Sequence, residues 1–291
     1  MRTLLLAVLV LSAAAHAQDE ADAGSVPAER AAPPAPWAYP FVFEQPVSIL
    51  PHGAGAQVHV LVDRTHAGAQ KASLVLFSAS SHVEEFPHRH DAAELVYVVE
   101  GKARVRGLPR KWIDLGPGDA ALVPAQAAHS VWLLGTARQP TKVLTLHAPA
   151  EEETPPKGVA ASLVEVRKTP AGAPLPTVMK ASAAKSYVIG AGQGSVRILL
   201  EGKAAYAGRL TANSGMAVPE HVHGGEAEIL YVLAGEGELT ASGKTLTVKP
   251  GHAVHMPPAQ PHAFKVTSTT PFEAVQFYAP SGPEQRFKPR P

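Results

Sequence analysis

The residues best suited to chemistry form a set of three histidines and one glutamate near the end of the chain. His221 and His223 are one residue apart, and Glu228 follows after a Gly-Gly turn. If this segment is a strand, both histidines point to the same face, because strand side chains alternate. His262 comes later, after a Pro-Gly turn and a further proline. Three imidazoles and one carboxylate are ligands that suit a divalent transition metal.

An equivalent set occurs earlier in the chain and consists of His88, His90, Glu94 and His129. Each histidine of the second set lies 133 residues after its counterpart, and the glutamate lies 134 residues after its own. The extra residue falls in the turn before the glutamate. Agreement over such distant segments indicates an internal duplication, in which one folding unit is written twice.

The composition narrows the fold and the function. At 291 residues the chain is long enough for about two domains. A formal net charge of +1 indicates neither nucleic acid nor an anionic membrane surface as a partner. The absence of cysteine excludes disulfides, thiolate metal sites and cysteine nucleophiles. Abundant glycine and proline between short Val/Leu-rich runs favour many short strands over long helices.

The start of the chain has the pattern of a secretory signal. Residues 1–17 combine the basic Arg2, an apolar core that is too short to span a bilayer, and a small-residue cleavage site ending at Ala17. We therefore expect a periplasmic or secreted protein with no membrane attachment after cleavage; the alternative is an uncleaved anchor or a buried helix. Residues 18–36, rich in Ala and Pro, predict a flexible leader.

The rest of the chain predicts two β-domains. Residues 37–150 contain roughly eight short strand candidates, which favours a sandwich or barrel. Residues 151–176 are expected to form a linker, and residues 177–291 repeat the scheme. The polar tail from residue 281 onward is expected to fray.

The two copies resemble the cupin superfamily. The first cupin motif, G(X)5HXH(X)3–4E(X)6G, is matched in full by Gly215, His221, His223, Glu228 and Gly235. The first copy matches at His88, His90, Glu94 and Gly101 but has His82 in place of the first glycine. The second cupin motif, G(X)5PXG(X)2H(X)3N, is matched in the two copies by Gly118, Pro124 and His129 and by Gly251, Pro257 and His262. Its inner glycine is replaced by Gln126 and Ala259, and its asparagine by Leu133 and Val266. These departures lie outside the ligands.

The resemblance implies an all-β bicupin with two tandem jelly-roll barrels and up to one metal ion in each, which can be Fe, Mn, Ni, Cu or Zn. It also implies that Glu94 or Glu228 can leave the metal and act as a catalytic base. Cupins include dioxygenases, decarboxylases, isomerases, lyases and binding proteins. Bicupin oxalate decarboxylases carry an arginine three residues before the HxH pair, where this chain has Glu85 and Val218. That difference counts against oxalate and leaves a dioxygenase-like reaction open.

Two functions follow as hypotheses. One is a secreted metalloenzyme that acts on a small oxygen-rich substrate, and it is the one we favour. The other is a non-catalytic protein that binds a sugar or metabolite, with the metal as an anchor or absent. We expect the second barrel to be the active one because its motif is more complete. Arg209, His255 and Tyr278 are lesser candidates for pocket residues, and the sequence leaves a homo-oligomer open.

Overall fold

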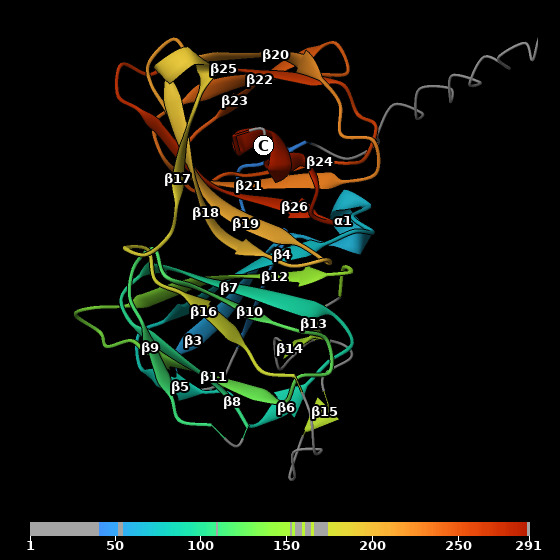
Figure 1. The fold of residues 1–291 in the computed structure, drawn as a ribbon. Coiled ribbons are helices and arrows are strands. Elements are labelled where there is room, and N and C mark those ends of the chain that lie inside the picture. Colours follow the sequence, from blue (N-terminus) through green and yellow to red (C-terminus); the bar gives the residue numbers. More distant parts are fainter. Residues whose placement is uncertain are drawn as a thin grey trace, which may run out of the picture. The chain divides into compact units, whose positions relative to one another are not determined.

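The structure is a computed structural model, and it describes residues 41–51, 55–108, 110–151, 153–154, 159–160, 164–165 and 174–289 (Figure 1). The predicted signal and leader lie outside the described residues, and the predicted linker lies inside them only in part. Two β-barrels account for most of the described residues, as the sequence predicted. Within these ranges no helix has the length and apolar character needed to cross a membrane.

The first barrel is built from two main sheets. The larger consists, in spatial order, of β16 (Thr177–Met179), β10 (Ala120–Val123), β7 (Ala93–Glu100), β12 (Thr141–Ala148), β4 (Ser73–Ala79), β3 (Ala56–Val62) and β2 (Ser48–Pro51). The smaller consists of β15 (Val164–Glu165), β6 (His88–Arg89), β11 (His129–Leu134), β8 (Ala103–Gly107) and β9 (Ile113–Leu115), with β5 (His82–Glu84) also paired to β11. A short helix, α1 (Arg64–Ala67), and a small hairpin of β13 (Glu153–Thr154) and β14 (Val159–Ala160) complete this half.

The second barrel repeats this arrangement. Its larger sheet consists of β1 (Val42–Phe43), β24 (Ala253–Met256), β21 (Ala227–Ala234), β26 (Phe272–Ala279), β19 (Tyr206–Ala212), β18 (Gly194–Glu201) and β17 (Ser186–Ile189). Its smaller sheet consists of β20 (Ala217–His221), β25 (His262–Val266), β22 (Gly237–Ala241) and β23 (Lys244–Val248). Two short 3-10 helices, η1 (Gly190–Gly192) and η2 (Pro283–Phe287), lie before β18 and after β26.

The strand that carries each motif glutamate is buried on both faces. In β7, Val96 and Val98 belong to the core inside the first barrel, whereas Leu95 and Tyr97 belong to a core that both barrels share. The corresponding strand β21 divides its side chains in the same way. A strand covered on both faces carries a continuous apolar run, because neither set of alternating side chains meets water. The alternation also places Glu94 on the same face as Val96, inside the barrel.

A glycine ends each of these strands because the neighbouring chain approaches closely there. Gly101 and Gly235 have φ angles of 77° and 72°, in the left-handed region. A Cβ atom on either glycine would lie 2.6 Å from a backbone carbonyl oxygen, that of Pro140 or Pro271. This contact explains the last glycine of the first cupin motif in both copies.

Each barrel receives one strand from the start of the other half of the chain. β1, which precedes the first barrel in the sequence, pairs with β24 of the second barrel. β16, which precedes the second barrel in the sequence, pairs with β10 of the first. The two pairings occupy equivalent edges, so the exchange is reciprocal. The domain boundaries themselves stay a prediction.

Candidate metal centres

The structure brings the four predicted residues of the first barrel together. One nitrogen or oxygen atom from each of His88, His90, Glu94 and His129 lies within 4.8 Å of the corresponding atoms of the others. Glu94 Oε2 lies 2.8 Å from His129 Nε2 and 3.6 Å from His90 Nε2. All four side chains are buried. The ligands come from β6, the turn after it, the start of β7 and the start of β11. Antiparallel pairing of β6 and β11 sets His88 opposite His129.

The second barrel builds the same group from His221, His223, Glu228 and His262. Glu228 Oε2 lies 3.2 Å from both His223 Nε2 and His262 Nε2. His221 pairs across the sheet with His262, as His88 does with His129. The main difference is that His221 is only partly buried.

The backbone fixes the orientation of two imidazoles in each group. The Nδ1 atoms of His88 and His129 lie 2.8 Å from the carbonyl oxygens of Phe86 and Ala127, each two residues earlier. A carbonyl can only accept a hydrogen bond, so Nδ1 must carry the proton and Nε2 keeps a free electron pair. His221 and His262 repeat this with the carbonyls of their own second preceding residues, at 3.0 and 2.9 Å.

The electrostatics of both groups suit a cation. Burial works to raise the pKa of Glu94, but the imidazoles of His129 and His90 outweigh it and hold that pKa well below its ordinary value. Glu228 is held low in the same way by His223 and His262. Burial lowers the pKa of His88 to about 4. Each site therefore offers a carboxylate, and the first barrel also offers a neutral imidazole at His88.

The donor sets fit a divalent transition metal. In the first barrel Glu94 Oε2 and His129 Nε2 are both buried, and neither makes a hydrogen bond to another described residue, although they are 2.8 Å apart. With Nδ1 of His129 protonated, its Nε2 directs an electron pair toward the carboxylate, and two such electron-rich atoms brought close together are typical of a shared ion. Metal binding by either group stays a prediction.

The two glutamates differ in the residues that contact the rest of the carboxyl group, away from the histidines. In the second barrel Glu228 Oε1 accepts hydrogen bonds from Gln276 Nε2 at 2.6 Å and from Tyr278 Oη at 3.3 Å. Tyr278 Oη in turn accepts a bond of 3.1 Å from Arg286 Nη2. These donors orient the carboxylate so that Oε2 faces the three histidines. Tyr278 had been a lesser candidate from the sequence, whereas no sequence pattern linked Gln276 or Arg286 to the site.

In the first barrel, a histidine and a second carboxylate lie beside the metal-ligand group. His147 stands opposite Glu94 in the sheet, as Tyr278 stands opposite Glu228. The rings of His90 and His147 are 5.0 Å apart, and Glu151 Oε1 lies 3.9 Å from His90 Nδ1. Ala92 N donates to this same Glu151 oxygen at 3.1 Å. Sequence spacing alone had not connected these two residues to the site.

In both barrels the turn before the last histidine keeps its conformation although the glycine of the cupin motif is replaced. Gln126 and Ala259 stand where the motif has glycine, and their φ angles are 63° and 59°. Both residues therefore adopt the left-handed conformation that glycine adopts most easily. The turn is retained because Gln126 N donates to His90 O and Ala259 N donates to His223 O.

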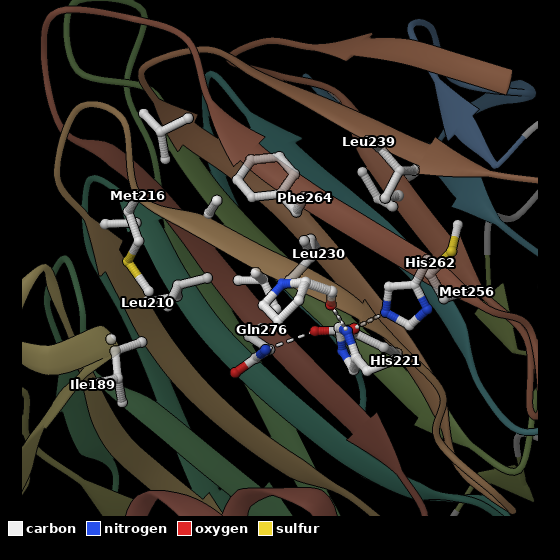
Figure 2. Close-up of a pocket in the computed structure, with 18 of the residues that line it drawn as sticks. Ile189, Leu210, Met216, His221, Leu230, Leu239, Met256, His262, Phe264 and Gln276 are labelled. Atoms are coloured by element: carbon white, nitrogen blue, oxygen red, sulfur yellow. Dashed lines mark hydrogen bonds and ion pairs between the residues drawn. The ribbon is translucent and has the colours of Figure 1, made fainter.

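A cavity of about 250 Å³ adjoins the second group. His221, Glu228 and His262 line it, together with Gln276 and mainly apolar side chains (Figure 2). Arg286 and Phe287 of η2 also line it. The expectation that the tail frays is therefore wrong for η2, which packs on the barrel through Phe287 and buries Glu284 to 1% exposure.

Two other residues singled out in the sequence lie outside this cavity. Arg209 forms an ion pair with Glu273 and is not among the lining residues. His255 is buried in β24, with its side chain on the opposite face from the lining residues Val254 and Met256.

Comparison with known protein families agrees with the geometry. Residues 76–147 and residues 208–278 each match the Cupin domain family. The chain is a bicupin. The two matched segments contain both four-residue groups, one in each domain. A search of curated proteins finds no significant match to this bicupin.

Solved structures with a similar fold include oxalate decarboxylases. The bicupin resembles the Lactobacillus farciminis enzyme in its formate complex with a TM-score of 0.66 and 16% identity, over 83% of this chain and 87% of that one. It resembles the Bacillus subtilis enzyme at pH 4.6 with a TM-score of 0.63 and 16% identity, over 83% of this chain and 76% of that one. At this identity the likeness establishes the shared bicupin fold.

Proposed function

We propose that the bicupin is a metal-dependent enzyme that acts on a small organic molecule in its second barrel. The observation that carries the proposal is the position of the second His3Glu group, which opens onto a cavity large enough for a ligand. A metal with protein ligands on one side and open space on the other can bind a substrate. In the first group His88 is more deeply buried than its counterpart His221, which favours a structural or regulatory role for an ion bound there.

A bound divalent metal would supply a Lewis acid or, if redox-active, a place for dioxygen. His221, His223, His262 and Glu228 would hold it. Glu228 Oε1 is occupied by its hydrogen bonds to Gln276 and Tyr278. Its Oε2 atom faces the histidines and would bind the metal, so it could take up a proton from substrate only after leaving the metal. A dioxygenase-like reaction remains our preferred class, on the resemblance alone.

Metal analysis tests the proposal first. We expect about two metal ions per chain of purified full-length protein, with about one remaining in His88→Ala and in His221→Ala. The metal's identity then selects the substrates to screen, with oxygen uptake as one readout. Turnover should be lost in His221→Ala and retained in His88→Ala. The reverse result would move the chemistry to the first barrel, and a chain that takes up no metal after reconstitution would contradict the enzyme proposal.

A non-catalytic binding protein is the second candidate, and the apolar cavity is the observation that favours it. The two candidates differ in what a chelator does. An enzyme loses turnover with its metal, whereas a binding protein that does not need the ion keeps its ligand affinity.

Export also forms part of the proposal, supported by the pattern of residues 1–17. Expression in a bacterium followed by mass measurement of the periplasmic protein should show a chain that begins near Gln18. Full-length protein retained in the cytoplasm would contradict it.

A further inference from the structure

The cavity of the second barrel is lined mainly by apolar side chains, which does not suit a small charged substrate. Apolar side chains from both sheets of the barrel supply most of the wall. Leu230, Leu239, Val254, Met256 and Val266 are among the buried ones, each no more than 8% exposed. In Figure 2, Phe264, Met216 and Leu210 extend this apolar surface away from His221 and His262.

The polar side chains of the cavity belong to the metal group or adjoin it. His221, His262 and Glu228 are three of the predicted ligands, and Gln276 donates to Glu228. Arg286 is the one lysine or arginine among the described lining residues, and its side chain is exposed and donates to Tyr278. Val218 also lines the cavity.

These walls select against a small dianion. A bound metal would offset part of the charge of a doubly charged ligand such as oxalate. The rest of the ligand would still lose its water among apolar side chains, for which one exposed arginine is a weak replacement. An apolar group gains affinity in the same surroundings in proportion to the surface that it buries. The polar end of the cavity still offers a place for oxygen atoms at the ligand group.

The volume indicates how large an apolar part the cavity can enclose. A cavity of about 150 Å³ lined by apolar side chains is enough for benzene. The second barrel offers about 250 Å³, which leaves room for one ring and a few further atoms.

We propose that the second barrel binds a molecule with one ring, or a chain of similar size, next to a pair of metal-binding oxygens. The two oxygens of this ligand lie on the side of the cavity formed by His221, His262 and Glu228. Its apolar part lies between Leu230, Leu239 and Val254. This assignment rests on the proposed metal site of the same barrel. It names the substrate class of the proposed enzyme and excludes oxalate as its substrate.

A series of three chelators separates the contribution of the apolar body from that of the metal. Benzohydroxamate and acetohydroxamate have the same two oxygens and differ in carrying a ring or a methyl group, and oxalate has chelating oxygens but no apolar body. The protein is the full chain carrying His88→Ala, loaded with metal, so that only the second barrel contributes a site. Affinities are measured by calorimetry and metal content by mass spectrometry.

We expect benzohydroxamate to bind at least about tenfold more tightly than acetohydroxamate, because the ring buries more apolar surface. Oxalate should bind more weakly than either. Filling the cavity with Leu239→Trp should reduce the advantage of the ring to less than about threefold while the metal content stays the same. Val218→Phe, at a partly exposed lining position, provides the same test if the first variant fails to fold. Val188→Phe is the matched control, since Val188 is 74% exposed and outside the lining.

Equal affinities for the two hydroxamates, or tightest binding of oxalate, would overturn the inference. In either case a retained metal ion would leave the proposed metalloenzyme intact. Loss of the metal from the second barrel before any ligand is added would instead contradict the proposed function on which the inference rests.

Discussion

The two barrels carry the same four ligand types but surround them differently. Opposite Glu94, the first barrel has His147, with Glu151 close by; opposite Glu228, the second has Tyr278, with Gln276 one pleat away. The first histidine of the set is 3% exposed in the first barrel and partly exposed in the second. The ligand set determines which metals can bind, whereas the neighbouring strand β12 or β26 determines how the carboxylate is held. The same set of ligands therefore does not imply the same role.

The largest expected difference between the barrels concerns the motif glutamates. We expect Glu228→Gln to lower turnover about a hundredfold or more, because it removes both a metal ligand and a proton acceptor. Glu94→Gln should leave turnover close to that of the wild type, although the first barrel loses metal affinity. Initial rates and metal content are measured on the same preparations. Equal losses of turnover in the two variants would show that the barrels work together.

A second difference is a buried histidine of the second barrel that has no counterpart at the equivalent position of the first. Burial lowers the pKa of His255 to about 4, whereas the equivalent position in the first barrel is Leu122. The unfolded chain takes up this proton below about pH 6.5 and the folded chain only near pH 4, so the folded state loses stability as the pH falls between these values.

We therefore expect His255→Leu to reduce the loss of unfolding free energy between pH 7 and pH 4.5 by about 2 kcal/mol. Urea unfolding in the presence of a chelator measures this without a contribution from bound metal. An unchanged pH dependence would mean that His255 titrates normally in the folded protein.

The hydrogen-bond donors to Glu228 Oε1 provide a third test of the difference between the barrels. Tyr278→Phe removes the hydroxyl that joins Glu228 to Arg286, and we expect it to weaken metal binding in the second barrel about tenfold. Competition with a chelator gives the affinity. Tyr206→Phe is a matched control, because Tyr206 stacks on Tyr278 but its buried hydroxyl has no hydrogen-bond partner among the described residues. Similar effects of both substitutions would point to ring packing instead.

The smallest expected effect concerns the two turns that lack the motif glycine. Ala259→Gly should stabilise the protein by about 0.5–1 kcal/mol, because it relieves a left-handed alanine at some cost in backbone entropy. Gln126→Gly should gain less, since it also removes the hydrogen bond from Gln126 to Asp91. Denaturant unfolding of the two variants checks the difference. A larger gain in the first barrel would show that the bond to Asp91 contributes little.

The sequence predicted the fold and both ligand groups because their signals are local. The HxH spacing, the glutamate and the strand-ending glycine lie within about one hairpin, and the duplication showed which positions correspond. Gln276 lies 48 residues after Glu228 in a mostly apolar strand, so only the register of β26 against β21 reveals their contact. The same holds for His147 and Glu94.

Other features were out of reach for a different reason. The period-two pattern of β21 and β22 predicts that Leu230 and Leu239 face inward, but it does not show whether their side chains meet or leave a cavity. η2 was interpreted as part of a fraying tail because its residues are polar, whereas Glu284 is buried. The exchanged strand β1 is only two residues long, too short for any periodicity to predict its partner.

The reciprocal pairing of β1 with β24 and of β16 with β10 has the form of an exchange between the subunits of a symmetric dimer. A protein with a single cupin unit could make the same two pairings only by associating with an identical copy. Every substitution would then appear twice, once in each site. Joining the units in one chain removes that constraint, so that one half can retain a site flanked by His147 and Glu151 while the other acquires an apolar cavity. Covalent linkage thus allows two sites of the same architecture to accept substitutions independently of each other.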